Sequence, residues 1–263
     1  MAMSQSPSQG NGKLYIVGTG PGNLEQMTAR AVAAIEDSDV VVGNKFYLDM
    51  LGPLIDGKEV VESSMGREVE RAKKAVELAR DRKVSMASGG DAGVYGMASI
   101  VLEIIESGGE DVNVEVVPGV TAASSAASLL GSPLSSDFMV ISLSDLLTTW
   151  AEIEERLEAA FTLGIPVVLY NPRSRRRKNN LAKALAIASK HLPATTPIGV
   201  VKNCYRPDEQ KKILTLKELR EDHSFVDMHS TVVVGGRTTR IWKVGDDVKG
   251  IITPRGYGRK YVY

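Results

Sequence analysis

Hydrophobic and polar residues form two alternating kinds of segment along the first half of this chain. Short apolar runs rich in β-branched residues, such as 14–18 (LYIVG) and 39–43 (DVVVG), are typical of buried strands. The segment 67–80 (REVERAKKAVELAR) instead has apolar residues at helical spacing. The same criteria predict further strands near residue 60 and at 84–88 and 114–119, and helices through 27–35, 97–107 and 121–130. This alternation predicts an α/β fold with a mostly parallel sheet and helices on both faces.

The pattern pauses at 131–137 (GSPLSSD), a stretch of serine, proline and glycine. We therefore predict two α/β domains, 13–132 and 133–263. In the second domain we expect strands at 138–143, 166–170, 196–201 and 231–236, an extended segment at 211–219, a helix near 149–162 and another after the basic stretch that follows residue 170. These strands predict a second, smaller sheet that can be mixed.

Composition limits the kinds of partner. The 32 basic residues balance the 32 acidic residues, so no overall field favours nucleic acid or an anionic membrane. A single cysteine cannot form an internal disulfide or hold a zinc ion or iron–sulfur cluster alone, and it fits a reducing cytoplasm. No apolar run approaches the ~20 residues of a membrane span. Residues 1–12 lack the apolar centre of a secretory signal, and we expect a disordered tail.

Two glycine-rich turns follow predicted strands. The first, 18–22 (GTGPG), departs from the dinucleotide-binding spacing G-x-G-x-x-G, and the chain has no P-loop. The second, 88–96 (SGGDAGVYG), lies where open α/β sheets bind ligands. Glycine lets a ligand approach the backbone closely, and Asp91 adds one fixed charge. The alternative for Asp91 is a cap on the following helix.

A third turn, 118–122 (PGVTA), leads into a helix of small residues. Short side chains leave the amides at the start of that helix, around Thr121, open to a ligand. Close packing of the helix on the sheet is the alternative. Together the three turns predict ligand-binding loops at the ends of three strands.

Several segments carry a resemblance to a known family. They are LYIVGTGPGN, GNKFYLDML, MGREVERA, SGGDAGVYGMA, VEVVPGVTAASSAA, LSDLLTTW, VVLYNPRSRRR and TPIGVVKN. In this order they resemble the tetrapyrrole (corrin/porphyrin) methylases. YLDML, LSDLL and YNPRSRRR are similar to the branch that methylates precorrin-3B, or cobalt-factor III, at C17 in vitamin B12 synthesis.

The resemblance implies a fold of two α/β domains with S-adenosylmethionine in the cleft between them, and a homodimer. It implies cofactor contacts from Pro21, Gly89, Gly90, Asp91, Thr121, Ala122, Tyr170, Asn171, Asn203 and Cys204. One departure is Ala92, which stands where the family more often has proline; it removes rigidity but no contact group.

The chemistry that the family implies needs little from the protein's own acids and bases. The methyl group is bound to a positively charged sulfur, so an electron-rich carbon can attack it without a protein nucleophile. The three histidines, His191, His223 and His229, fit packing or surface positions better than a catalytic triad. Ring contraction adds proton transfers, for which the candidates are Asp49, Ser142, Ser144 and Asp145. Helix capping by Ser144 or Asp145 is the alternative.

Basic residues are candidates for holding a substrate with many carboxylates. Arginine pairs well with carboxylates. The candidates in one short loop are Arg173, Arg175, Arg176, Arg177 and Lys178, with Lys45 and Arg67 in addition. A solvated helix start or an RNA-facing patch are the alternatives.

These observations favour S-adenosylmethionine-dependent C17 methylation of a precorrin-3B-type tetrapyrrole, with ring contraction. The alternatives are a methylase for another precorrin, for a protein or for ribosomal RNA, such as a diphthine synthase, and a non-catalytic tetrapyrrole carrier. A nicotinamide-dependent oxidoreductase is disfavoured by the glycine spacing. The sequence leaves open whether the substrate already holds cobalt.

Overall fold

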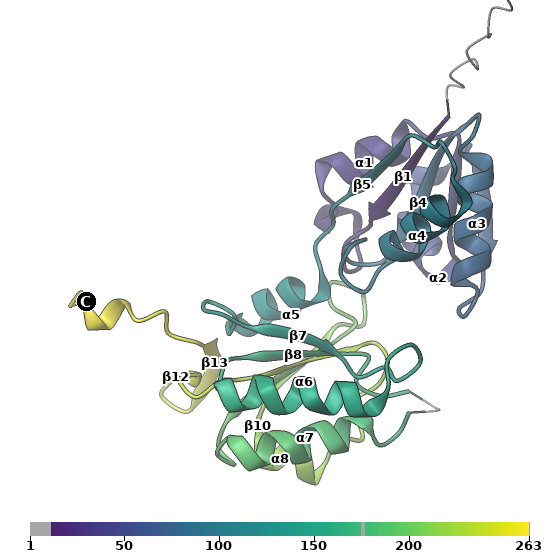
Figure 1. Ribbon diagram of the computed structural model, residues 1–263. Helices are drawn as coiled ribbons and strands as arrows, with labels where there is room; N and C mark the ends of the chain where they lie inside the picture. Colours follow the sequence, from purple (N-terminus) through teal and green to yellow (C-terminus); the bar gives the residue numbers. More distant parts are fainter. Residues whose placement is uncertain (1–11, 175–176, 263) are drawn as a thin grey trace, which may run out of the picture. The chain divides into compact units, whose positions relative to one another are not determined.

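The computed structural model describes residues 12–174 and 177–262. The chain divides into two compact units, Met1–Thr121 and Ala122–Tyr263 (Figure 1). The expected tail at residues 1–12 lies outside the described residues, apart from Gly12. None of the helices in the described ranges is both long and apolar enough to cross a membrane.

The first unit is built on a five-stranded sheet in the order β3-β2-β4-β1-β5, and every pairing is parallel. Its strands are β1 (Lys13–Gly18), β2 (Val40–Asn44), β3 (Glu59–Ser63), β4 (Lys83–Ser88) and β5 (Val114–Val117). Its helices are α1 (Ala29–Glu36), α2 (Lys45–Leu51), α3 (Glu68–Leu78) and α4 (Ala98–Gly108), with short 3₁₀ turns at Leu24–Gln26 and Gly52–Ile55. The predicted parallel sheet is confirmed, whereas α2 was not predicted.

Alternation along β1 shows how the helices cover both faces of this sheet. Leu14 and Ile16 pack in a cluster with residues of α3 and α4. Tyr15 and Val17 pack in another cluster with residues of α1 and α2. Successive side chains of a strand point to opposite faces, so a strand buried on both faces reads as the continuous apolar run seen in the sequence.

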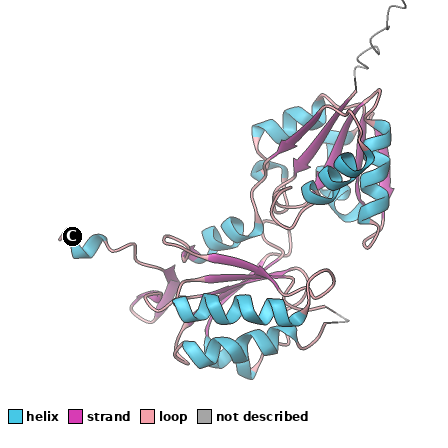
Figure 2. Ribbon diagram, viewed as in Figure 1, coloured by secondary structure: helices cyan, strands magenta, loops and turns pink. Residues whose placement is uncertain are grey.

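The second unit contains a mixed five-stranded sheet in the order β10-β9-β11-β8-β7 (Figure 2). Its strands are β7 (Met139–Ser142), β8 (Val167–Tyr170), β9 (Pro197–Lys202), β10 (Gln210–Thr215) and β11 (Ser230–Val234). Only β7 and β8 pair in parallel among the described strands of this sheet. The expectation of a mixed sheet is confirmed, but the expectation of a smaller one is wrong, because both sheets have five strands.

Helices α6 (Trp150–Leu163), α7 (Asn180–His191) and α8 (Leu216–Glu221) cover one face of this sheet, and α5 (Ala122–Leu130) covers the other (Figure 1). The division between the units thus falls before α5, and not at 132/133 as the sequence suggested. Gly199 in β9 explains part of this packing. A Cβ atom there would lie 2.3 Å from Cδ1 of Leu130, so the glycine leaves room for the helix.

A third, small sheet was not predicted. It joins the hairpin of β12 (Arg240–Val244) and β13 (Asp247–Ile252) to the two-residue strand β6 (Gly131–Ser132), in the order β12-β13-β6. β6 is part of the Gly-Ser-Pro pause that the sequence suggested as a domain boundary. Its pairing with β13 instead makes this segment part of the second unit.

Candidate functional site

Three loops of the first unit meet at the carboxyl ends of β1, β4 and β5. The Gly20 amide donates to the Gly90 carbonyl at 3.0 Å, and the Gly90 amide donates to the Gly20 carbonyl at 2.8 Å. A Cβ atom on Gly119 would lie 2.3 Å from the Gly90 oxygen and 2.6 Å from the Gly18 carbonyl carbon. These glycines therefore let three backbones pack directly on one another.

Asp91 binds this group of loops together. Its Oδ1 accepts hydrogen bonds from the amides of Gly93 (2.8 Å) and Val94 (3.1 Å), and its Oδ2 accepts one from the amide of Gly119 (2.9 Å). The following helix, α4, begins only at Ala98 with Met97 as its N-cap, so Asp91 does not cap it. The carboxylate instead closes its own turn and fixes the neighbouring loop.

Gly89 and Pro21, two further predicted cofactor residues, lie in the same loops. A Cβ atom on Gly89 would fall 2.1 Å from Cε1 of Tyr47, so the absence of a side chain makes room for that ring. Pro21 is buried. Tyr47 was not among the predicted site residues, although it stands within the YLDML phrase.

In the second unit, Tyr170 lies against the start of α5. The amide of Ala123 donates to the Tyr170 hydroxyl at 2.6 Å. Ala122 is the first residue of α5 and Tyr170 is the last residue of β8. The structure thus brings Ala122 and Tyr170 into one neighbourhood, as expected if both contact the same ligand.

Asn171 follows β8 with a φ of +51°, in the left-handed region that asparagine tolerates better than most residues. Its side-chain amide donates to Ser142 Oγ at 2.9 Å, and the Ser144 amide donates to the same oxygen at 3.2 Å. β7 and β8 are parallel neighbours in which Ser142 lies opposite Tyr170. Two serines predicted for catalysis and an asparagine predicted for cofactor binding therefore form one cluster.

Asn203 repeats this geometry after β9, with a φ of +50°. Its side-chain amide donates to Asp208 Oδ2 at 2.6 Å, and its backbone amide donates to the His229 carbonyl at 3.0 Å. Cys204 beside it is buried, and this burial raises the pKa of the thiol to about 12. The Cys204 side chain is therefore neutral at physiological pH.

Helix α6 is capped by Thr149 and not by the two candidates that precede it. The Thr149 hydroxyl and Glu152 form a reciprocal capping box. The capping alternative for Ser144 and Asp145 is therefore excluded at this helix. Asp145 instead lies 3.9 Å from Nε of Arg177, one of the arginines in the predicted basic loop.

Three of the other charged candidates pair with residues that are close to them in the sequence. Asp49 accepts a hydrogen bond from Lys45 Nζ at 2.8 Å on exposed α2, and Arg67 pairs with Glu70. Arg173 donates to the carbonyls of His223 (3.3 Å) and Ser224 (3.1 Å), which ties it to a neighbouring segment. Arg175 and Arg176 lie outside the described residues.

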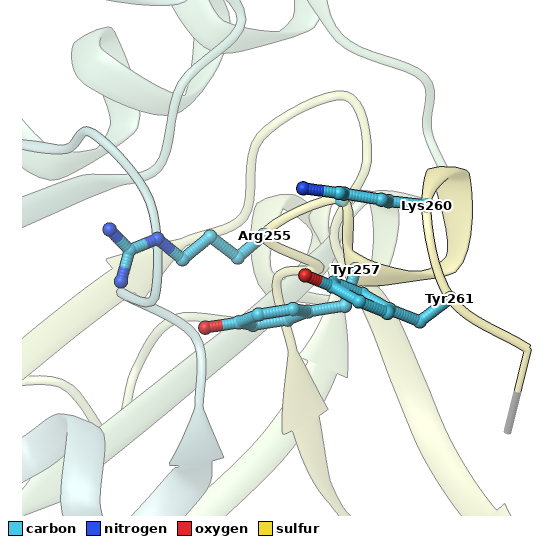
Figure 3. Close-up of a pocket in the computed structure, with 5 residues that line it drawn as sticks. Arg255, Tyr257, Lys260 and Tyr261 are labelled. Atoms are coloured by element: carbon cyan, nitrogen blue, oxygen red, sulfur yellow. The ribbon is translucent and has the colours of Figure 1, made fainter.

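A cavity of about 350 Å³ lies near the C-terminal end of the described chain (Figure 3). It is lined by Arg255, Gly256, Tyr257, Lys260 and Tyr261. A neighbouring cavity of about 530 Å³ includes Arg240 and Arg259. No residue predicted for the site lines either cavity, so neither cavity corresponds to the predicted site at the strand ends.

The family relationship follows from residues 13–220, which match the model of the tetrapyrrole (corrin/porphyrin) methylases. The chain belongs to this family. Tetrapyrrole methylases are S-adenosylmethionine-dependent methyltransferases, and the glycine loops and asparagine turns belong to such an enzyme.

Curated tetrapyrrole methylases include close relatives. A probable cobalt-factor III C(17)-methyltransferase of Salmonella typhimurium (strain LT2) is 44% identical over 93% of this chain and 99% of its own length. A precorrin-3B C(17)-methyltransferase of Sinorhizobium sp is 38% identical over 94% and 97%. The cobalamin biosynthesis protein CbiHC of Archaeoglobus fulgidus is 45% identical over 95% of this chain, which spans about half (54%) of that relative.

Solved structures of tetrapyrrole methylases share the fold. The methyltransferase CobJ superposes with a TM-score of 0.86 at 30% identity, covering 93% of this chain and 100% of that chain. A uroporphyrin-III C-methyltransferase from Thermus thermophilus gives 0.63 at 25% identity, covering 86% and 92%. The predicted fold class is thereby confirmed.

The residues at the strand ends fit S-adenosylmethionine chemically. Its adenine, ribose, amino and carboxylate groups need both donors and acceptors at close range. The glycine loops offer backbone groups, and Asn171 and Asn203 offer backbones in an unusual conformation with fixed side-chain amides. Ala122 and Ala123 have small side chains, and the Cys204 thiol is neutral.

Proposed function

We propose that this methyltransferase acts on C17 of a precorrin-3B-type tetrapyrrole, with contraction of the macrocycle, in cobalamin biosynthesis. The observation that carries the proposal is the 44% identity to the Salmonella relative over nearly the full length of both chains. The fixed strand-end loops of each unit support it, because methyl transfer depends on alignment.

Alignment is the main contribution of the chain in this proposal. When bound, S-adenosylmethionine supplies an electrophilic methyl group, so the protein needs no nucleophile of its own. Holding two reactants in line can contribute ~7–11 kcal/mol. The triple glycine contact and the three amide bonds on Asp91 restrict movement of the first-unit loops. The asparagine turns restrict the second-unit loops through their bonded side-chain amides instead.

Cofactor binding is assigned to two sets of residues, each testable by itself. The glycine-loop set is Pro21, Gly89, Gly90, Asp91 and Thr121, and the asparagine-turn set is Ala122, Tyr170, Asn171, Asn203 and Cys204. Titration calorimetry with S-adenosylhomocysteine on variants of each set measures the two contributions separately.

Proton transfer during ring contraction is assigned to Ser142, Ser144 and Asp145 at the end of β7, with Asp49 as the candidate on α2. Two donors on Ser142 Oγ orient that hydroxyl.

Asp145→Asn should lower kcat about 100-fold and leave cofactor affinity within twofold, since general acid–base groups contribute 10²–10⁴-fold. Asp247→Asn is the matched control, because Asp247 is exposed and pairs with Lys249 on its own strand. An unchanged kcat in Asp145→Asn would remove this residue from the chemistry.

Substrate carboxylates are assigned to Arg175 and Arg176, supported by Arg173, Lys45 and Arg67. Arg173 has a positioning role, because its guanidinium donates to the carbonyls of residues 223 and 224. Replacing Arg175 and Arg176 with alanine should raise the tetrapyrrole KM about tenfold while the cofactor KM stays the same. Lys217→Ala, at an exposed position of α8, is the control. An equal rise for the cofactor would contradict the assignment.

The decisive experiment offers labelled S-adenosylmethionine with precorrin-3B or with cobalt-factor III. Relatives named for each substrate exist, so both arms are needed. We expect a product one methyl group heavier in one of the two arms, detected by mass spectrometry. Label found only in protein or ribosomal RNA would favour the diphthine synthase-like alternative, and macrocycle binding without transfer would favour a carrier.

We further propose that the enzyme is a homodimer in the cytoplasm. The family resemblance supports the dimer, and the reduced single thiol fits the compartment. Light scattering should give twice the chain mass of 28.3 kDa.

A further inference from the structure

The C-terminal part of the second unit carries four basic side chains that line the two cavities described above. They are Arg240, Arg255, Arg259 and Lys260, here called the C-terminal basic cluster. Neither cavity has an aspartate or glutamate among its described lining residues. In the part of the chain that the structure describes, none of the four forms an ion pair with a carboxylate, whereas Lys249 on β13 pairs with Asp247. The cluster therefore concentrates positive charge without a carboxylate from the described chain.

Two tyrosine rings lie among these cations. The ring centroids of Tyr257 and Tyr261 are 6.5 Å apart, and the two residues are 59% and 55% exposed. The Nζ atom of Lys260 lies 5.5 Å from the Tyr261 centroid. Figure 3 shows the Arg255 guanidinium, the Lys260 ammonium and both tyrosine hydroxyls directed to the same side. The first cavity thus combines positive charge with flat apolar surface.

Buried threonines fix the segment that carries the cluster. The hydroxyl of Thr253, a residue that is 3% exposed, donates to the Pro133 carbonyl at 2.5 Å and lies 2.8 Å from the Thr239 hydroxyl. Gly256 has a φ of +92°, and the turn that this glycine permits leads into the 3₁₀ turn Tyr257–Arg259. A ligand therefore has to order the side chains of the cluster but not its backbone, which lowers the entropic cost of binding.

The cluster lies at the opposite edge of the second sheet from the asparagine turns. β9 is antiparallel to β11, and β11 is antiparallel to β8, so β8 and β9 run in the same direction. Asn171 and Asn203 follow the carboxyl ends of these two strands. At the amino end of β9, the amide of Gly235 donates to the carbonyl of Pro197, and the chain then turns to Thr239, which contacts the C-terminal segment. The cluster is therefore separate from the residues of the second unit that are proposed to bind the cofactor.

All four cations also lie beyond the region that matches the model of the tetrapyrrole methylases. That match ends at residue 220, whereas the first member of the cluster is Arg240. Every residue proposed for cofactor binding comes before residue 220. The position of the cluster in the chain therefore fits a task that concerns the substrate more than the cofactor.

We propose that the C-terminal basic cluster is a second binding site for the tetrapyrrole macrocycle, one that holds it outside the residues proposed for methyl transfer. The choice of ligand rests on the proposed function. Arginine forks bind carboxylates, so several cations suit a ligand with carboxylates around its rim. The exposed tyrosine rings suit a flat conjugated body, because aromatic rings favour offset stacking. RNA also offers negative charge and flat bases, but the balanced charge of the whole chain does not favour it.

The test titrates uroporphyrin, a stable porphyrin with many carboxylates, into the full chain and follows its absorbance and fluorescence. Arg255→Ala/Arg259→Ala removes two exposed cations of the cluster. Arg220→Ala/Lys243→Ala is the matched control, because it removes the same charge from exposed positions that line neither cavity. At a concentration that just saturates the parent protein, we expect the cluster variant to bind one macrocycle fewer per chain and the control to bind as many as the parent.

Two further readouts separate this site from the methyl-transfer site and from general attraction of charge. The kcat of methyl transfer and the Kd of S-adenosylhomocysteine should stay within about twofold of the parent in the cluster variant, since exposed substitutions away from the site have small effects. Coproporphyrin, which has fewer carboxylates than uroporphyrin, should bind to the cluster more weakly.

The inference is overturned if the cluster variant binds as many macrocycles as the parent, or if the control loses as many as the variant. Displacement of uroporphyrin from the parent, but not from the cluster variant, by low concentrations of an RNA oligonucleotide would assign the cluster to RNA instead. Failure of the proposed function looks different, because neither precorrin-3B nor cobalt-factor III would be methylated. The comparison of uroporphyrin binding would still decide the role of the cluster.

Discussion

The strand-end loops of the two units reach fixed conformations by opposite means. In the first unit the loops after β1, β4 and β5 pack backbone on backbone at Gly18, Gly90 and Gly119. In the second unit the loops after β8 and β9 turn through Asn171 and Asn203, each with a bonded side-chain amide. The first solution removes side chains, whereas the second uses them.

This difference predicts which substitutions each set of loops tolerates. A backbone contact cannot adjust to an added atom, so the glycine loops should be intolerant of any side chain. The asparagine turns depend on two separable properties, a tolerated φ and a hydrogen bond, so different substitutions should affect them separately.

The largest expected effect is from Gly119→Ala. The new Cβ would lie 2.3 Å from the Gly90 oxygen, so the backbone must shift. We expect a loss of about 3 kcal/mol in the free energy of unfolding of the first unit, measured by urea denaturation. Gly199→Ala should cost less, since its Cβ would meet side-chain atoms of the buried Leu130 and not backbone. Gly108→Ala, at the end of α4, should be neutral or stabilising. Equal costs at Gly119 and Gly199 would contradict the distinction.

Asp91→Asn should have the next largest effect. The carboxylate accepts three backbone hydrogen bonds, and the new NH₂ group would face at least one amide donor. We expect a loss of about 2 kcal/mol in stability, together with weaker binding of S-adenosylhomocysteine in calorimetry. Loss of stability with unchanged cofactor affinity would leave Asp91 a purely structural role.

Asn171 allows the two properties of its turn to be separated. Asn171→Ala removes the bond to Ser142 and places alanine at a φ of +51°, so it should cost about 2 kcal/mol. Asn171→Gly relieves the strain and should cost only about 1 kcal/mol. If the side chain also contacts the cofactor, both variants should lose affinity equally. Urea denaturation and calorimetry on the same samples measure both effects.

The smallest expected effect is on pH dependence and arises from Cys204. Its pKa in the folded chain is raised to about 12 from 9.0. Stability from the neutral thiol is therefore complete below pH 9 and is lost as the pH rises from 9 toward 12. Between pH 7 and pH 9.5 the parent should lose about 1 kcal/mol more than Cys204→Ala. Parallel stability curves for the two proteins would show that the thiol ionises as easily in the folded chain as in the unfolded chain.

Much of the first unit could be predicted because a parallel sheet buried on both faces produces continuous apolar runs. The second unit was harder. β12 is largely exposed and carries an irregular register at Trp242/Lys243, so it has no clear apolar alternation. The boundary was misplaced because α5 consists mainly of alanine and serine, which do not indicate the sheet on which the helix packs.

The site was partly predictable for a similar reason. Glycine permits backbone conformations that other residues rarely adopt, so the local sequence located the loop at Gly90. Asn171 was identified only through the family resemblance. Contacts between distant segments could not be predicted. The bonds of Arg173 to the carbonyls of 223–224, and the space that Gly89 leaves for Tyr47, depend on tertiary packing alone.

The position of β11 also determines the order in which the chain can fold during synthesis. All five strands of the first sheet have been made once Val117 is added, whereas β11, which lies between β9 and β8, ends at Val234. At a rate of roughly 10 residues per second, the ribosome completes the first sheet about 10 s before the second. Once β8 and β9 have been made, each has an edge without its final partner until β11 is complete, so the nascent second unit is the part of the chain that most needs protection by chaperones.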